Sequence, residues 1–170
     1  IPKSELETYD KFITYIWGKV FNEENAFTKV TRWFLGSNIE ISKLAAEQLA
    51  SACHEVAIVD QNFIRGWHWW IQAFGLGTIS SYLTKGGSRY IMFDCSNALI
   101  RFVKAKYKSG EIVKVRQFFT DLCREHKEFD GLFDFDNNTN KICDSLSLSL
   151  RLLHNLKVIE LSYTPDSSDI

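Results

Sequence analysis

The sequence predicts a mainly α-helical protein with short antiparallel β-hairpins, built as two tandem units. Residues 61–94 have the pattern of an apolar helix, a glycine stop, a strand, a tight turn and a returning strand. Residues 144–170 have a similar order near the other end of the chain. Apolar residues make up 45% of the sequence and charged residues 24%, with only 2 prolines, which is typical of a packed globular protein. We therefore expect two compact units without a long disordered linker.

The helix expected over residues 61–74 is amphipathic and rich in aromatic residues. Its apolar positions recur mostly at intervals of three and four, which places them on one face of a helix. Gly75 follows the last of these positions, where the left-handed conformation of a C-cap favours glycine. The side chains expected to face inward are Phe63, Trp67, Trp70, Ile71 and Phe74.

A β-hairpin is expected directly after this helix. Residues 78–83 are rich in β-branched and aromatic side chains, and residues 89–93 form the returning strand, with Ile91 and Phe93 on the same side. Between them, residues 85–88 contain two glycines, which supply the positive φ angles of a tight turn. Since a lone hairpin is only marginally stable in water, this one must pack against the helices.

Three helical segments are expected before the aromatic helix. The first begins near Ser4, which can form a capping box with Glu7. The second closes at Gly36, and the third spans residues 40–59. Small residues in the third segment permit a close helix crossing, as a helix-turn-helix unit requires, although any three-helix core gives the same pattern. The expected apolar face of the first helix comprises Tyr9, Phe12, Ile13, Ile16, Trp17 and Val20.

The second half of the chain is expected to contain three more helices and a strand. Residues 145–150 alternate serine and leucine, which also fits a strand, but the leucines extend into a broad stripe at helical spacing. An acidic, asparagine-rich loop is expected over residues 128–141. The helices are expected over residues 96–108, 113–126 and 144–155, and the strand, as part of a second hairpin, over residues 157–163.

The order of these elements resembles the winged helix-turn-helix superfamily. Residues 72–79 and 154–161 both carry a helix end followed by an apolar strand, which suggests an internal repeat, although two such junctions can also be similar by chance. The resemblance implies two tandem winged units, 1–94 and 95–170, the second ending within its wing. It also implies a non-catalytic DNA-binding module of a larger protein, since such units occur in prokaryotic regulators and defence proteins.

The resemblance also indicates which side chains would contact double-stranded DNA. The second helix of a helix-turn-helix unit enters the major groove, where arginine pairs with guanine and glutamine with adenine. Basic residues of the wing hold phosphates. The candidates on the polar sides of the two reading helices and on the first wing are Arg65, His68, Gln72, Lys85, Arg89 and Arg151. The alternative interpretation is that these residues form a solvated polar face.

A protein-interaction module with the same fold is the alternative function, in which exposed aromatic residues meet a protein partner or a second copy in a homodimer. A basic cluster of Lys104, Lys106, Lys108, Lys114 and Arg116 is a further candidate for phosphate contacts. No Walker loop, nucleophile elbow or dinucleotide motif occurs, and Cys123, His126 and Cys143 lack a fourth metal ligand. The sequence therefore predicts neither an enzyme nor a cofactor.

The net charge and the hydropathy of the sequence limit the kinds of partner that we expect for this protein. The formal net charge of −1 excludes binding to nucleic acid through bulk charge alone, but it permits a local basic face. No apolar run is long enough to span a bilayer, and the first residues carry no secretory signal. The 4 cysteines form no CxxC pair and are interpreted as reduced thiols. We expect a cytoplasmic protein without a membrane partner.

Overall fold

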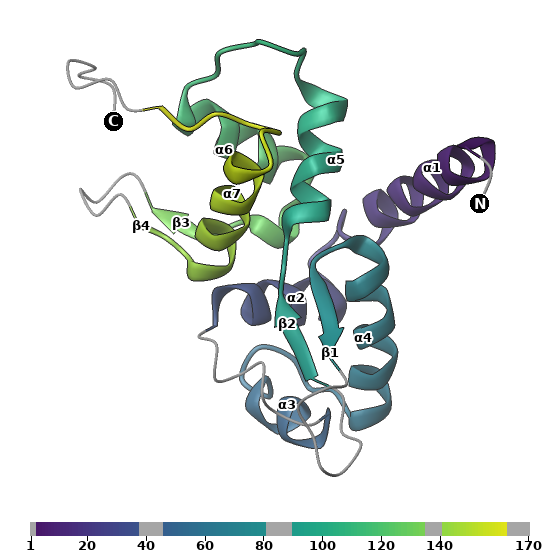
Figure 1. Ribbon diagram of the computed structural model, residues 1–170. Coiled ribbons are helices and arrows are strands. Elements are labelled where there is room, and N and C mark those ends of the chain that lie inside the picture. Colours follow the sequence, from purple (N-terminus) through teal and green to yellow (C-terminus); the bar gives the residue numbers. More distant parts are fainter. Residues whose placement is uncertain (1–2, 38–45, 81–89, 135–140, 163–170) are drawn as a thin grey trace.

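The computed structural model describes residues 3–37, 46–80, 90–134 and 141–162 (Figure 1). Within these ranges the chain forms seven α-helices, one short 3-10 helix and two antiparallel sheets of two strands each, so the mainly helical fold class with short hairpins is confirmed. The elements are α1 Lys3–Val20, α2 Ala26–Gly36, α3 Ala46–Ala52, α4 Gln61–Phe74, β1 Gly77–Ser80, β2 Tyr90–Phe93, α5 Ser96–Lys106, α6 Val115–Glu125, η2 Lys127–Phe129, β3 Phe133–Asp134, β4 Lys141–Ile142 and α7 Asp144–Asn155.

The helices surround a hydrophobic core that runs through both halves of the sequence. Figure 1 shows α2, α3, α4 and the β1–β2 sheet at one end of the molecule, and α5, α6 and α7 at the other. The boundary at residue 94 falls between β2 and α5, but the core does not divide there. The fully buried side chains come from both sides of this boundary and include Trp17, Phe34, Trp67, Phe74, Leu99, Phe119, Leu146 and Leu153.

Helix α1 extends away from the rest of the molecule over its first half (Figure 1). Its second half packs as expected, because Ile13 and Trp17 are buried in the core. The prediction that Tyr9 and Phe12 face the core is wrong, since these side chains are 52% and 53% exposed. The helix continues past the surface that covers its C-terminal part, so Tyr9 and Phe12 lie in solvent.

The boundaries of α4 follow from local chemistry, as the sequence predicts. Asp60 caps its N-terminus by accepting a hydrogen bond from the backbone N–H of Phe63 at 2.7 Å. Gly75 ends the helix in the left-handed conformation with φ 68°. A Cβ atom added at Gly75 would lie 2.7 Å from Cβ of Asn97, so close packing against α5 also requires glycine here.

The hairpin expected after α4 is confirmed by the antiparallel pairing of β1 with β2, in which Gly77 lies opposite Phe93 and Ser80 opposite Tyr90. Its strands alternate between core and solvent, because Ile91 is buried and Met92 is 48% exposed. The expected turn at 85–88 lies outside the described residues.

The third helix ends earlier than the sequence suggests. The prediction of a helix up to Val59 is wrong, because α3 ends at Ala52 and residues 53–56 form a turn. The expected start of this segment, at residues 40–45, lies outside the described residues.

The C-terminal strand expected over 157–163 is not formed by the described residues 157–162, which have turn and irregular structure. Lys157 adopts a left-handed φ of 58° and reverses the chain. The backbone N–H of Val158 then donates to the Leu153 carbonyl at 3.0 Å, so the segment folds back onto α7. A hairpin does occur in this half, as β3 and β4, but it precedes α7.

Two buried serines join α7 to other elements of the fold. The Ser145 hydroxyl donates to the Leu35 carbonyl at 2.6 Å, which ties α7 to the end of α2. The Ser149 hydroxyl accepts a hydrogen bond from the backbone N–H of Cys95 at 2.9 Å. Both serines are buried, so the serine–leucine alternation that also fitted a strand belongs to a helix whose small polar side chains bond the backbone of neighbouring elements.

Candidate nucleic-acid interface

Helix α4 presents a line of polar and aromatic side chains to solvent. Asn62, Arg65, Trp69 and Gln72 follow one another at intervals of three, four and three, and all four are exposed. Such residues lie on one face of a helix and span about 15 Å along its axis. We call these four residues the outward face of α4. Two of them, Arg65 and Gln72, are among the candidate DNA contacts predicted from the sequence.

The guanidinium of Arg65 is held at the start of this face. Its Nη2 atom donates to Oε1 of Gln61 at 3.0 Å, one helical turn earlier. A side chain with one fixed donor loses less conformational entropy when its remaining donors bind a ligand. The bond to Gln61 therefore orients Arg65 along α4, and a guanidinium is the group that can pair with a planar acceptor such as guanine.

His68 lies at the edge of the buried face of α4 and not on the polar side that we expected. Only 6% of its surface is exposed, and it shares the buried face with Ile64 and Ile71. Trp70, which the sequence pattern places inward, is instead 41% exposed and stacks on Phe74 with ring centroids 5.5 Å apart. The prediction that His68 belongs to the polar side is wrong, because the buried face of α4 is rotated relative to the one the aromatic spacing indicated.

The remaining candidate DNA contacts are not part of the outward face of α4. Arg151 is exposed on α7, which lies in the other half of the molecule from α4 (Figure 1). Lys85 and Arg89 lie outside the described residues. The structure therefore brings Arg65 and Gln72 together on one helix face and separates Arg151 from them.

Contacts on its inner side fix the position of α4. The Trp67 indole N–H donates to Oγ1 of Thr31 at 2.9 Å, and both residues are buried. The Trp67 ring also meets the Phe34 ring edge to face, with centroids 5.0 Å apart. A specific hydrogen bond and apolar packing thus hold α4 against α2. These contacts fix the position of the helix that carries the outward face.

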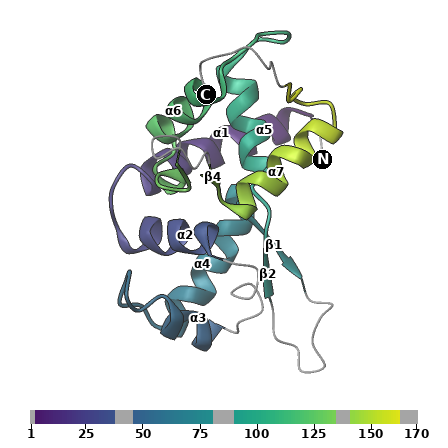
Figure 2. The same cartoon turned by 90° about the vertical axis from the view of Figure 1, so that its left-hand side faces the viewer.

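The β1–β2 hairpin packs closely beside the C-terminal end of α4 (Figure 2). A Cβ atom on Gly77 would lie 2.8 Å from a side-chain carbon of Ile91 and 2.9 Å from one of Ile71. Glycine at this position therefore lets β1 begin in contact with Ile71 of α4, while Ile91 of β2 packs against the same backbone. The hairpin and the helix form one continuous unit.

The basic cluster near residues 104–116 is partly neutralised. Lys106 Nζ lies 2.6 Å from Oε1 of Glu125, which joins α5 to α6. This acidic partner on α6 reduces the positive charge that the cluster can offer to phosphates.

No protein-family model, no curated protein and no solved structure matches this chain.

Across residues 3–37, 46–80, 90–134 and 141–162, no helix is both long enough and apolar enough to cross a bilayer. In the same ranges, no three His, Cys, Asp or Glu side chains converge as metal ligands, Cys123, His126 and Cys143 included.

A buried polar cluster, which the sequence did not predict, lies behind α1. Glu128 was expected in a solvated acidic loop, but its side chain is completely buried in η2. Its Oε1 atom accepts the indole N–H of Trp17, and its Oε2 atom has no hydrogen-bond partner among the described residues. The His126 ring packs on Trp17 with centroids 4.3 Å apart, and its Nδ1 lies 3.7 Å from Oε1 of Glu128.

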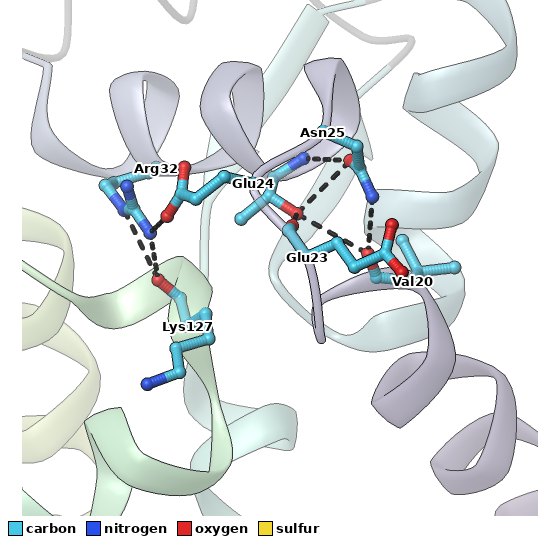
Figure 3. A network of polar contacts seen from close by, with 7 residues as sticks. Val20, Glu23, Glu24, Asn25, Arg32 and Lys127 are labelled. Carbon is cyan, nitrogen blue, oxygen red and sulfur yellow. Dashed lines mark hydrogen bonds and ion pairs between the residues drawn. The ribbon is translucent and has the colours of Figure 1, made fainter.

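Arginine side chains secure this cluster from two directions. The Arg101 guanidinium lies 5.1 Å from the centre of the Trp17 ring and donates to the Phe74 carbonyl at the end of α4. Arg32 donates to the Lys127 carbonyl at 2.7 Å and to Oε1 of Glu24 at 2.6 Å, as Figure 3 shows. The carbonyl bond fixes η2, and with it the adjacent Glu128, against α2.

Burial shifts both titratable groups of the cluster toward their neutral forms. Loss of solvation raises the pKa of Glu128 from 4.5 to about 8, although the hydrogen bond from Trp17 acts in the opposite direction. Burial also lowers the pKa of His126 from 6.5 to about 4. At neutral pH the cluster therefore consists of a protonated carboxylic acid beside a neutral imidazole.

Proposed function

We propose that this chain is a non-catalytic DNA-binding module in which α4 is the recognition helix and the β1–β2 hairpin is the wing. The order α2, α3, α4, β1 and β2 supports this proposal, because it is the order of helices and hairpin in a winged helix-turn-helix unit. Residues 95–170 would act chiefly as the packing partner of that unit, since the second wing expected after α7 is absent from described residues 157–162.

The observation that carries the proposal is the spacing of Arg65 and Gln72 on the outward face of α4. The two residues lie seven positions apart, which is about two turns or roughly 10 Å along the helix. Base pairs stack about 3.4 Å apart, so these side chains would reach bases about three steps apart in the major groove. Trp69 between them would contact a thymine methyl group or the sugar backbone.

The test measures binding of a mixed-sequence DNA duplex by fluorescence anisotropy at several salt concentrations. We expect the affinity to fall steeply with salt, with a slope of about 0.9 for each phosphate contact. Arg65→Ala combined with Gln72→Ala should weaken binding about tenfold or more. Lys141→Ala, which removes one positive charge from exposed β4, is the matched control and should leave affinity nearly unchanged. Absence of salt-dependent binding, or equal affinity of the double variant and the native chain, would refute the proposal.

A second candidate function has its own support in the exposed aromatic residues of α4. Trp69 is 59% exposed and Trp70 is 41% exposed, and exposed tryptophans are typical centres of protein interfaces. In this alternative the outward face of α4 would bind a partner protein of a regulatory or defence complex. The duplex titration distinguishes the two functions, because a protein-binding face would give no salt-dependent association with DNA.

A further inference from the structure

Helix α1 is held on the rest of the molecule by few side chains. Its first half extends away from the other elements (Figure 1), and among its described side chains only Ile13 and Trp17 are buried. Of these two, only Trp17 carries a polar group, and its indole N–H donates to Oε1 of Glu128 in η2. The same ring packs on His126 and lies beside the Arg101 guanidinium. The attachment of α1 therefore depends on the site that receives Trp17.

The Glu128 carboxyl group at this site is buried in a way that favours its protonated form. Its side chain has no exposed surface, and its Oε2 atom has no hydrogen-bond partner among the described residues. An ionised carboxylate needs several donors to replace the water that it loses, and Trp17 supplies one. Burial accordingly raises the pKa of Glu128 to about 8. The site therefore accepts the neutral acid and not its anion while Trp17 is in place.

The groups around Glu128 do not neutralise its anion by direct contact. Arg32 and Arg101 donate to backbone carbonyl groups of other residues. The Nδ1 atom of His126 lies 3.7 Å from Oε1 of Glu128, but burial lowers the pKa of this imidazole to about 4, so it is neutral at pH 7. The titratable and charged groups of the surrounding elements are His126, Arg32 of α2, Arg101 of α5, Glu125 and Cys123 of α6, and Cys95 before α5.

We propose that a proton on Glu128 holds α1 in its place, and that loss of this proton releases the helix. When Trp17 leaves the site, the carboxyl group reaches water and ionises, so every condition that removes the proton favours the open arrangement. Opening also uncovers Phe74 at the end of α4, whose ring stacks on that of Trp17 with centroids 6.2 Å apart. The fold therefore contains a pH-sensitive switch. It does not depend on what α4 binds.

The two pKa values of Glu128 set the size of the response. The closed arrangement releases the proton near pH 8, and a solvated glutamate in the open arrangement releases it near 4.5. Between these values the ratio of open to closed molecules should rise about tenfold with each pH unit. Glu128→Gln keeps an oxygen that accepts the Trp17 indole N–H but cannot ionise, so this rise should be absent from the variant. Both chains retain His126, and a comparison at the same pH therefore isolates Glu128.

The test measures hydrogen exchange of α1 amides by NMR at pH 5.5, 6.5 and 7.5, in low concentrations of guanidinium. For each amide, the rate in the native chain divided by the rate in Glu128→Gln should rise about tenfold per pH unit. The α1 rates should depend little on guanidinium, because a local opening exposes little surface. Glu160→Gln, at an exposed glutamate, is the matched control and should exchange like the native chain. The native chain alone gives a second measurement, because its α1 opening constants, corrected for intrinsic exchange rates, should rise about tenfold per unit from pH 6.5 to 8.

Two results would overturn the proposal. The same pH dependence of α1 exchange in the native chain and in Glu128→Gln would show that the proton on Glu128 does not control α1. If α1 amides had the same guanidinium dependence as the buried amides of α7, the helix would leave only when the whole protein unfolds, and there would be no separate switch.

Discussion

Glu128→Gln should change how the stability of the protein depends on pH. Glutamine keeps the oxygen that accepts the Trp17 indole N–H but cannot lose a proton. The folded native protein holds the Glu128 proton up to a pKa of about 8, whereas the unfolded chain releases it near 4.5. Between these pH values the folded state binds one more proton at this site, so this site favours folding less and less as pH rises.

The size of this change in stability follows from the interval between the pKa values of Glu128 in the unfolded and folded states. Each pH unit within it reduces the free energy of unfolding by about 1.4 kcal/mol, which amounts to a few kcal/mol in total. Typical domains are stable by about 5–15 kcal/mol, so the change is large enough for denaturant titrations to resolve. Arg32 is the cation that acts on Glu128, and its charge opposes the rise in the pKa of this carboxyl group.

His126 acts in the opposite direction over part of the same range. The unfolded chain binds its proton below about pH 6.5, whereas the folded protein binds it only below about 4. This site therefore increases stability as pH rises from 4 to 6.5. We expect the contributions of Glu128 and His126 to cancel between about pH 4.5 and 6.5, and the loss due to Glu128 to appear alone between 6.5 and 8.

Guanidinium unfolding at a series of pH values tests this prediction. The stability of the native chain relative to Glu128→Gln should fall steadily from about pH 5 to 8, by about 1.4 kcal/mol per unit. Glu160→Gln, at an exposed glutamate, is the matched control and should follow the native curve. Parallel curves for the native chain and Glu128→Gln would show that Glu128 is ionised in the folded protein and would refute the assigned burial.

Four further substitutions test the support of the proposed interface. Thr31→Val removes the acceptor of the Trp67 indole N–H and should cost about 1–3 kcal/mol of stability, because a buried donor is left unpaired. Gly75→Ala should destabilise by more than about 1 kcal/mol through its positive φ and the contact with α5, whereas Gly66→Ala, with open space around it, should stabilise α4 by up to about 1 kcal/mol. Asn25→Ala should cost about 1–2 kcal/mol, because its side chain caps α2 and bonds the end of α1.

Denaturant midpoints measured at one pH check these changes. A neutral Thr31→Val variant would mean that Trp67 finds another acceptor. If Gly66→Ala and Gly75→Ala had the same sign, the left-handed C-cap of α4 would be in doubt. A neutral Asn25→Ala variant would remove the side-chain network of Figure 3 as a cause of the α1–α2 geometry.

Local sequence signals made the end of α4 and the hairpin after it predictable. The end of α4 at Gly75 and the strands on either side of residues 81–89 depend on neighbouring residues, and both predictions are confirmed. The buried face of α4 was less predictable. His68 and Trp70 are adjacent to buried positions on opposite sides, and which one turns inward depends on how α4 packs on the rest of the fold.

Other features depend on contacts that local patterns do not record. Glu128 follows a basic helix end and begins an acidic segment, which indicates exposure, yet its partner Trp17 lies 111 residues away. The apolar residues after Lys157 suggested a strand, but the left-handed backbone at this lysine returns them to α7. Lysine has no local preference for that conformation, so the sequence carried no signal for the reversal.

In the proposed function, the outward face of α4 meets duplex DNA. Adding a mixed-sequence duplex to isotopically labelled protein and following amide and indole resonances by NMR tests this claim most directly, because it reports where contact occurs. We predict that the Trp69 indole and the amides of Arg65 and Gln72 shift, and that the amides of exposed α6 residues such as Thr120 do not. Unchanged α4 resonances at saturating duplex, or shifts confined to α5 and α6, would contradict the claim.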